Sequence, residues 1–294
     1  RRQQPPIVIK ADGLAAGKGV IITDSMPEAN KALSDIMEAK IFGSAGDRAI
    51  IDKYVTGREV SLIAFTDGKT VLPMLPACDY KKIWDGDQGP NTGGMGSYCP
   101  PGFFSTELVE KVTNTILLPT IRAMANEGMP YKGVLYAGLM VVDGKPLVLE
   151  FNARFGDPEN QVILPLLKTD LMEILLAVVQ GNLDQLKIEW SSDACVGVVM
   201  ASAGYPGSYK TGFPIQGLEN IPKDLLIFHA GTKLGDDGTI YTDGGRVLTM
   251  VGMGKDMAEA REKVYGNISK IQFEGCYYRK DIALREIKGI NSKS

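Results

Sequence analysis

The stretch IIDKYVTGREVSL, residues 50–62, decides the fold of this chain. Its apolar start predicts a strand over 49–55, and EVSLIAF predicts a second strand over 59–65. The linker from Lys53 to Val55 presents backbone N–H and C=O groups that can bind a flat heterocycle such as adenine. Glu59 can then accept hydrogen bonds from ribose hydroxyls. The stretch therefore predicts the adenosine end of a nucleotide site.

A glycine-rich stretch precedes it. ADGLAAGKGV, residues 11–20, follows an apolar strand that ends in Lys10. Glycines lack a Cβ atom, so backbone N–H groups there can approach an anion such as a phosphate chain. Asp12 and Gly19 stand where a Walker A loop needs Gly and Ser or Thr, and Gly13 does not fit a dinucleotide fingerprint. The stretch alone is also typical of an ordinary glycine-rich turn.

A third stretch, LVLEFNARFGDPE, covers residues 147–159. Because side chains alternate along a strand, Glu150 and Asn152 point to the same face. A carboxylate and an amide oxygen on one face suit a hard cation such as Mg²⁺, which also keeps waters and phosphate oxygens. Arg154 continues that face and can bind a phosphoryl group. The alternative is a strand end with solvated polar residues.

Composition excludes several classes of function. The 294 residues carry a net charge of −3, which gives no indication of nucleic-acid binding. No apolar run reaches membrane-spanning length, so we expect no membrane partner and a cytoplasmic location. His229, the only histidine, lies in an apolar strand and is expected to be packed. The scattered cysteines indicate reduced thiols: Cys78, Cys99, Cys195 and Cys276.

The rest of the chain alternates helices and hairpins. Ser25 and Glu28 form a capping box that opens a helix to about Lys40. Asp-Gly pairs at 67–68 and 143–144 predict hairpin turns. Further helices are predicted over 105–126, 169–181 and 256–270, and residues 79–102 are predicted to be mostly loop.

A strand lysine, a glycine-rich flap, the linker and an E-x-N strand in this order resemble the ATP-grasp family. The resemblance implies an α+β fold in which two lobes hold ATP between them. It predicts a small lobe over 1–66, a large lobe with the magnesium and substrate sites over 67–193, and a small mixed C-terminal domain over 194–294.

Several blocks are similar to the phosphoribosylamine–glycine ligase family. They are KADGLAAGKGV (10–20), GPNTGGMGSYCP (89–100), LYAGLM (135–140), EFNARFGDPE (150–159), FHAGT (228–232), GGRVL (244–248) and FEGCYYRKDIA (273–283). The resemblance covers nearly the whole chain. It implies a ligase that joins glycine to 5-phosphoribosylamine through glycyl phosphate, giving glycinamide ribonucleotide, ADP and phosphate in purine biosynthesis. It also implies ATP with Mg²⁺ or Mn²⁺, and a monomer.

The resemblance also implies roles for individual residues. The residues implied to bind ATP are Lys10 on the phosphates, Gly13, Gly17, Lys18 and Gly19 in the flap, Lys53 and Val55 at the adenine, and Glu59 at the ribose. Glu150 and Asn152 are implied to bind the metal, and Arg154 to face the γ-phosphate and acyl phosphate. Asp157 is implied to orient the amine, and the loop containing Asn91 and Gly94 to border both substrates.

The family's N-terminal domain is expected to be missing, since RRQQPP runs directly into a buried type of strand. The parent protein is then expected to be a ligase, and one alternative for this chain is a nucleotide-binding fragment without turnover. A different ATP-grasp carboxylate–amine ligase is the other alternative. The sequence leaves two roles open. Lys18 either helps to cover the phosphates or is solvated. Lys81 and Lys82 either form a solvated face or contact the substrate phosphate.

Overall fold

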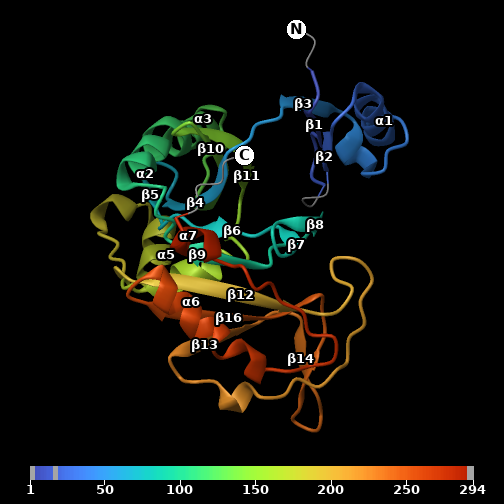
Figure 1. Ribbon diagram of the computed structural model, residues 1–294. Helices are drawn as coiled ribbons and strands as arrows, with labels where there is room; N and C mark the ends of the chain where they lie inside the picture. The colour runs from blue at the N-terminus through green and yellow to red at the C-terminus, as the bar shows by residue number, and fades with distance from the viewer. Residues whose placement is uncertain (1–3, 16–18, 290–294) are drawn as a thin grey trace. The chain divides into compact units, whose positions relative to one another are not determined.

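The computed structural model describes residues 4–15 and 19–289, and the chain divides after Thr56 into two compact units (Figure 1). The first unit is an antiparallel sheet in the order β2-β1-β3, formed by β1 (Ile7–Ala11), β2 (Val20–Thr23) and β3 (Ala49–Lys53). Helix α1 (Met26–Met37) packs Ala29, Ala32 and Ile36 on the sheet. It begins as predicted, because the Ser25 hydroxyl accepts from the backbone N–H of Glu28.

The second unit contains a four-stranded sheet in the order β11-β10-β4-β5. Its strands are β4 (Arg58–Thr66), β5 (Val71–Pro73), β10 (Gly133–Val142) and β11 (Lys145–Asn152). Both predicted Asp-Gly turns are present, since β4 pairs with β5 and β10 with β11. The structure places β4 in this unit and not in the first, because its whole length pairs with β10. The first unit thus ends ten residues before Thr66, the predicted end of the small lobe.

A five-stranded sheet, β13-β16-β12-β9-β6, joins distant parts of the chain. β12 (Ala194–Ala201), β13 (Leu225–His229) and β16 (Arg246–Gly254) come from the predicted C-terminal domain. β6 (Cys78–Asp79) and β9 (Gly96–Cys99) come from the predicted large lobe. Because β9 pairs with β12, the sheet continues across the predicted boundary at 193 and 194, and residues 57–289 belong to one unit.

Helices cover the sheets of the second unit (Figure 1). α2 (Thr106–Val112), a π-helical turn (Thr113–Leu117) and α3 (Leu118–Asn126) make the predicted helix over 105–126. They pack on the face of β4 and β10 that carries Leu62 and Leu135. The opposite face packs at one end on α4 (Asn160–Ile163) and α5 (Leu171–Gln180). α6 (Met257–Tyr265) packs on β16 and β12, and α7 (Leu284–Ile287) ends the described chain.

Two predictions for local structure were wrong. The segment 79–102 also contains a hairpin, β7 (Lys82–Trp84) and β8 (Gln88–Asn91), in addition to β6 and β9. His229 ends β13 as an exposed residue, not a packed one, and its Nδ1 lies 3.1 Å from the hydroxyl of Thr232. A further hairpin, β14 (Thr232–Leu234) with β15 (Ile240–Thr242), follows it.

Candidate active site

One face of the four-stranded sheet carries polar side chains on β4 and β11, with a glycine of β10 between them. Ser61 of β4, Gly138 of β10 and Glu150 of β11 are cross-strand partners in one row. This row lies on the face of the sheet that packs on α4 and α5. Ser61 is buried there beside Glu159, whereas Glu150, on the edge strand β11, is exposed to solvent.

Glu150 and Asn152 lie together on that face, as the alternation predicts. The Asn152 amide donates to a Glu150 carboxylate oxygen over 3.4 Å. Gly138, opposite Glu150, leaves room for this pair, since a Cβ atom there would lie 3.3 Å from Glu150 Cγ. The space for the Glu150 side chain therefore depends on the glycine at position 138 of the neighbouring strand.

The two oxygen donors fit a magnesium ion. No group of three or more His, Cys, Asp and Glu side chains among the described residues is arranged to hold a metal alone. Mg²⁺ commonly binds through one or two protein oxygens, with waters and substrate phosphates as the remaining ligands. Glu150 and Asn152 match that donor set, and their binding of metal remains a prediction.

A group of charged side chains lies beside this pair. Lys81 Nζ forms an ion pair of 3.0 Å with Glu59, the residue predicted at the ribose. Burial raises the pKa of Asp79 to about 7, helped by the carboxylates of Glu159 and Glu59 and opposed by Lys81. Burial lowers the pKa of Lys81, but Asp79 and Glu59 outweigh it and the net pKa is raised. A carboxyl group with a pKa this perturbed is typical of functional sites.

A buried hydrogen-bond network of Ser61, Tyr136 and Glu159 lies beside these residues. The hydroxyls of Ser61 and Tyr136 lie 2.6 Å apart, and both donate to the same oxygen of Glu159 over 3.1 and 2.8 Å. Glu159 is 3% exposed, and burial together with this carboxylate raises the pKa of Tyr136. The guanidinium carbon of Arg154 lies 5.9 Å from the centre of the Tyr136 ring, a cation–π contact. Arg154 also donates to the Phe155 carbonyl over 2.8 Å.

Asp157 is held by an arginine that the sequence did not single out. Arg246, at the start of β16, donates to both carboxylate oxygens of Asp157 over 3.2 and 2.7 Å. The same guanidinium donates to the carbonyl of Gly93 over 2.7 Å. A further bond to Asp157 comes from Gln161 over 2.8 Å. An ionised carboxylate has about four acceptor positions, so Asp157 retains capacity for another donor.

The predicted substrate loop lies against Asp157. Gly94 adopts φ +110°, and a Cβ atom there would lie 2.3 Å from Cδ of Pro158. The Tyr205 hydroxyl accepts from the N–H of Gly93 over 2.9 Å. The structure thus brings the Asn91–Gly94 loop, Asp157 and the C-terminal residues Arg246 and Tyr205 together. GGRVL and GYPG carry these last two residues, but neither block reveals its partner.

The remaining predicted ATP residues belong to the first unit. Lys10 Nζ pairs with Asp52 over 2.6 Å. The N–H of Gly13 donates to the Ala45 carbonyl over 3.0 Å, and a Cβ atom on Gly13 would lie 2.5 Å from Ala45 Cα. Gly19 accepts from the N–H of Ala11 over 2.8 Å. Gly13 therefore has a packing role, whatever else the loop binds.

Lys53 ends β3 as an exposed residue, and Val55 follows it half-buried in the linker. Gly17 and Lys18 lie outside the described residues. The nucleotide roles of all these residues remain predictions.

The sheets and the polar strand end define a protein of the ATP-grasp class. A biotin carboxylase from Campylobacter jejuni shares this fold with a TM-score of 0.68 at 15% identity, over 93% of this chain and 59% of that chain. Residues 1–160 match the family model "Phosphoribosylglycinamide synthetase, ATP-grasp (A) domain", and residues 195–285 match the C domain of the same synthetase. The chain belongs to the phosphoribosylglycinamide synthetase family.

Two relatives illustrate the extent of the match. The chain is 52% identical over 278 residues to a phosphoribosylamine–glycine ligase of Caldanaerobacter subterraneus, covering 95% of this chain and 66% of that protein. The solved phosphoribosylamine–glycine ligase of Thermotoga maritima is 38% identical with a TM-score of 0.86, covering 95% of this chain and 69% of that chain. The chain thus spans about two thirds of the length of these relatives. No helix in the described ranges has the length and apolar character to cross a membrane.

Proposed function

We propose that this chain is part of an ATP-dependent ligase that joins glycine to 5-phosphoribosylamine. Family membership supports the reaction class. The observation that carries the proposal is the convergence of Glu150, Asn152, Arg154 and Asp157 with the Asn91–Gly94 loop in one unit. The products are glycinamide ribonucleotide, ADP and phosphate.

The reaction needs an activated carboxylate, because a free carboxylate is a poor electrophile. In the proposed reaction, the glycine carboxylate attacks the γ-phosphorus of ATP and forms glycyl phosphate and ADP. The amine of 5-phosphoribosylamine then attacks the glycyl carbonyl carbon, and phosphate leaves. Catalysis of this kind is mainly positioning and charge stabilisation, so no side-chain nucleophile is required.

The side chains of the second unit suit these tasks. Glu150 and Asn152 would hold Mg²⁺, which supplies positive charge to the phosphates when bound. Arg154, whose guanidinium contacts the Tyr136 ring, would stabilise the transferred phosphoryl group. Asp157, fixed by Arg246, would accept from the amine substrate and orient its lone pair. Lys10 and Glu59 are proposed to bind the triphosphate and the ribose.

We expect the protein to act as a monomer in the cytoplasm. All four cysteines are free thiols, and three of them are buried. Free thiols are stable in a reducing compartment.

A steady-state assay tests the function. It measures ADP release that depends on both glycine and 5-phosphoribosylamine, for this chain and for the complete protein. Turnover in the complete protein, with nucleotide binding alone in this chain, would identify this chain as a nucleotide-binding portion. ADP release driven by another carboxylate but not by glycine would favour a different carboxylate–amine ligase. Absence of glycine-dependent release in both forms would reject the proposal.

A further inference from the structure

Arg279 is the largest fully buried side chain of the described chain, and it is charged. It lies in FEGCYYRKDIA, one of the sequence blocks to which the proposed reaction gives no role. Removing a guanidinium from water is costly unless ion pairs and hydrogen bonds satisfy it. The contacts of Arg279 therefore show what this segment is built to hold.

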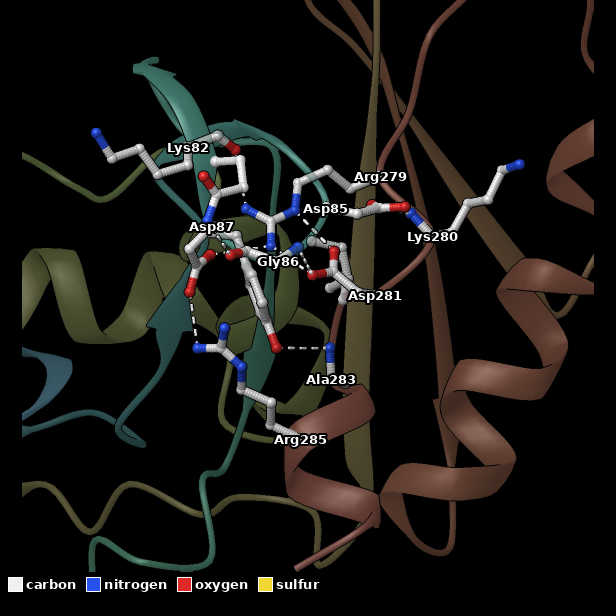
Figure 2. Close-up of polar contacts among 12 residues, drawn as sticks. Lys82, Asp85, Gly86, Asp87, Arg279, Lys280, Asp281, Ala283 and Arg285 are labelled. Atoms are coloured by element: carbon white, nitrogen blue, oxygen red, sulfur yellow. Dashed lines mark hydrogen bonds and ion pairs between the residues drawn. The ribbon is translucent and has the colours of Figure 1, made fainter. Parts of the chain in front are cut away.

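Those contacts reach the β7–β8 hairpin almost 200 residues earlier in the chain, at its first residue, Lys82, and at Asp87 in its turn (Figure 2). Arg279 NH1 donates to the Lys82 carbonyl over 2.9 Å, and NH2 donates to the Asp87 carboxylate over 2.9 Å. Asp281 accepts from the other side of the guanidinium over 2.8 and 2.6 Å. Each of the three guanidinium nitrogens thus donates a hydrogen bond, and two of the acceptors, the Lys82 carbonyl and the Asp87 carboxylate, belong to the hairpin.

The neighbouring residues bind the same turn. Asp281 accepts from the N–H of Gly86 over 2.8 Å, and the N–H of Lys280 donates to Asp85 over 2.8 Å (Figure 2). Burial would raise the pKa of Asp281, but the bonds from Arg279 and Gly86 lower it, so the carboxylate stays ionised. Gly86 and Asp87 adopt φ +68° and +56°. Such a conformation is unfavourable for aspartate unless its surroundings fix it.

The base of this hairpin carries the predicted substrate loop. The Lys81 carbonyl accepts from both the N–H and the hydroxyl of Thr92, over 2.7 and 2.8 Å. Lys81 forms the ion pair with Glu59, and Thr92 leads into Gly93 and Gly94. Arg279 binds the hairpin at Lys82 and at Asp87 in the turn, whereas Arg246 binds the loop at Gly93. A small apolar cluster of Ile83, Met95 and Ala201 packs beside these polar contacts.

We infer that Arg279 is a positioning residue that fixes the β7–β8 hairpin and, through it, Lys81 and the Asn91–Gly94 loop for binding of glycine and the amine substrate. The identity of the substrates in this inference rests on the proposed function, whereas the anchoring of the hairpin by Arg279 does not. A buried ion pair with a purely structural role would instead stabilise the whole second unit without preference for this segment.

The test compares three variants by hydrogen exchange and by kinetics of the complete protein. Arg279→Met removes every hydrogen bond and ion pair of the guanidinium, and Arg279→Lys keeps the charge but loses the planar fork. Arg285→Met is the matched control, since its guanidinium pairs with the same Asp87 over 2.7 Å but is 42% exposed. Should Arg279→Met fail to fold, Asp87→Asn removes one charge of the same ion pair from the hairpin side.

We expect exchange of amides 82–94 to accelerate about tenfold or more in Arg279→Met relative to β12 and β16, less in Arg279→Lys, and under about twofold in Arg285→Met. The KM for glycine or the amine substrate should rise about tenfold while the KM for ATP stays within about twofold. Uniform acceleration across residues 57–289, or a loosened hairpin with unchanged KM values, would overturn the inference. If the wild-type protein shows no glycine-dependent turnover, the proposed function is rejected instead. Hydrogen exchange of amides 82–94 would then still decide whether Arg279 anchors the hairpin.

Discussion

Asp79 offers a direct test of the electrostatics of the site. Its pKa is raised from the usual 3.8 to about 7, chiefly by burial. Between these two values the folded protein binds more protons than the unfolded chain. The free energy of unfolding therefore falls as pH rises from about 4 to about 7. A difference of about three pKa units at 1.36 kcal/mol each sets an upper limit of roughly 4 kcal/mol on that fall.

The substitution Asp79→Asn removes the titration while keeping size and polarity. We expect the variant to resemble the wild type in stability at about pH 4.5, where Asp79 is largely protonated in the folded protein. At about pH 8 the variant should be more stable than the wild type by about 1–4 kcal/mol, because it carries no buried charge. The variant gains stability relative to wild type as pH rises.

Asp67→Asn is the matched control, since the pKa of this buried aspartate is shifted in the opposite direction. Burial would raise the pKa of Asp67, but backbone N–H groups of Thr70, Lys69 and Leu183 outweigh it and the pKa is lowered. The ionised Asp67 carboxylate therefore stabilises the folded protein at pH values above the pKa of the unfolded chain, and this stabilisation is lost as pH falls through the pKa of the folded protein. Asp67→Asn should therefore cost stability at neutral pH, and less so below about pH 4.

The assay is urea unfolding of the three proteins at constant ionic strength, in steps from about pH 3.5 to about pH 8. A free-energy difference between Asp79→Asn and wild type that stays constant within about 0.5 kcal/mol would refute the reasoning. It would mean that Asp79 titrates as it does in the unfolded chain, and that the group of charges around Lys81 is more hydrated than the structure indicates.

Three further substitutions probe the site. Glu150→Gln should lower magnesium-dependent turnover of the complete protein about 100-fold or more, with little change in thermal stability because the carboxylate is exposed; wild-type turnover would sink the metal assignment. Gly94→Ala should cost roughly 2–5 kcal/mol in urea unfolding, since φ is +110° and the new Cβ atom would meet Pro158; a neutral effect would show that the loop rearranges easily. Arg246→Met should cost about 1 kcal/mol or less, because Asp157 is half exposed, yet raise the KM for the amine substrate; an unchanged KM would argue against Asp157 as its orienting group.

Much of the fold follows from local signals. The two Asp-Gly turns predict the hairpins of the four-stranded sheet, because positive φ at Gly68, Asp143 and Gly144 matches the turn each hairpin needs. The alternation in β11 places Glu150 beside Asn152 without any knowledge of the rest of the sheet. These features depend on neighbours within a few residues, which is why a single sequence reveals them.

The missed features depend on partners far along the chain. β9 is four residues long and contains Gly96 and Ser97, so its strand character comes from pairing with β12, about 100 residues later. Arg246 gives no sign of its role until Asp157, 89 residues away, is found within hydrogen-bonding distance. Ser61 and Tyr136 read as ordinary strand residues until the fold brings Glu159 between them. Spacing in the sequence cannot encode such contacts.

The same long-range contacts help to explain how a largely polar loop is fixed when its own apolar cluster, Ile83 and Met95 with Ala201, is small. Segment 78–99 enters the five-stranded sheet through β6 and β9, and between these strands it is anchored by two arginines from the C-terminal part of the chain. Arg246 acts at Gly93, beside Asp157, and Arg279 acts at the hairpin tip. Hydrogen bonds from a rigid guanidinium set direction as well as distance, so they can fix a backbone that presents mostly glycine and polar residues. The C-terminal part is therefore structurally continuous with the candidate substrate site, and changes in it should register in substrate binding as well as in stability.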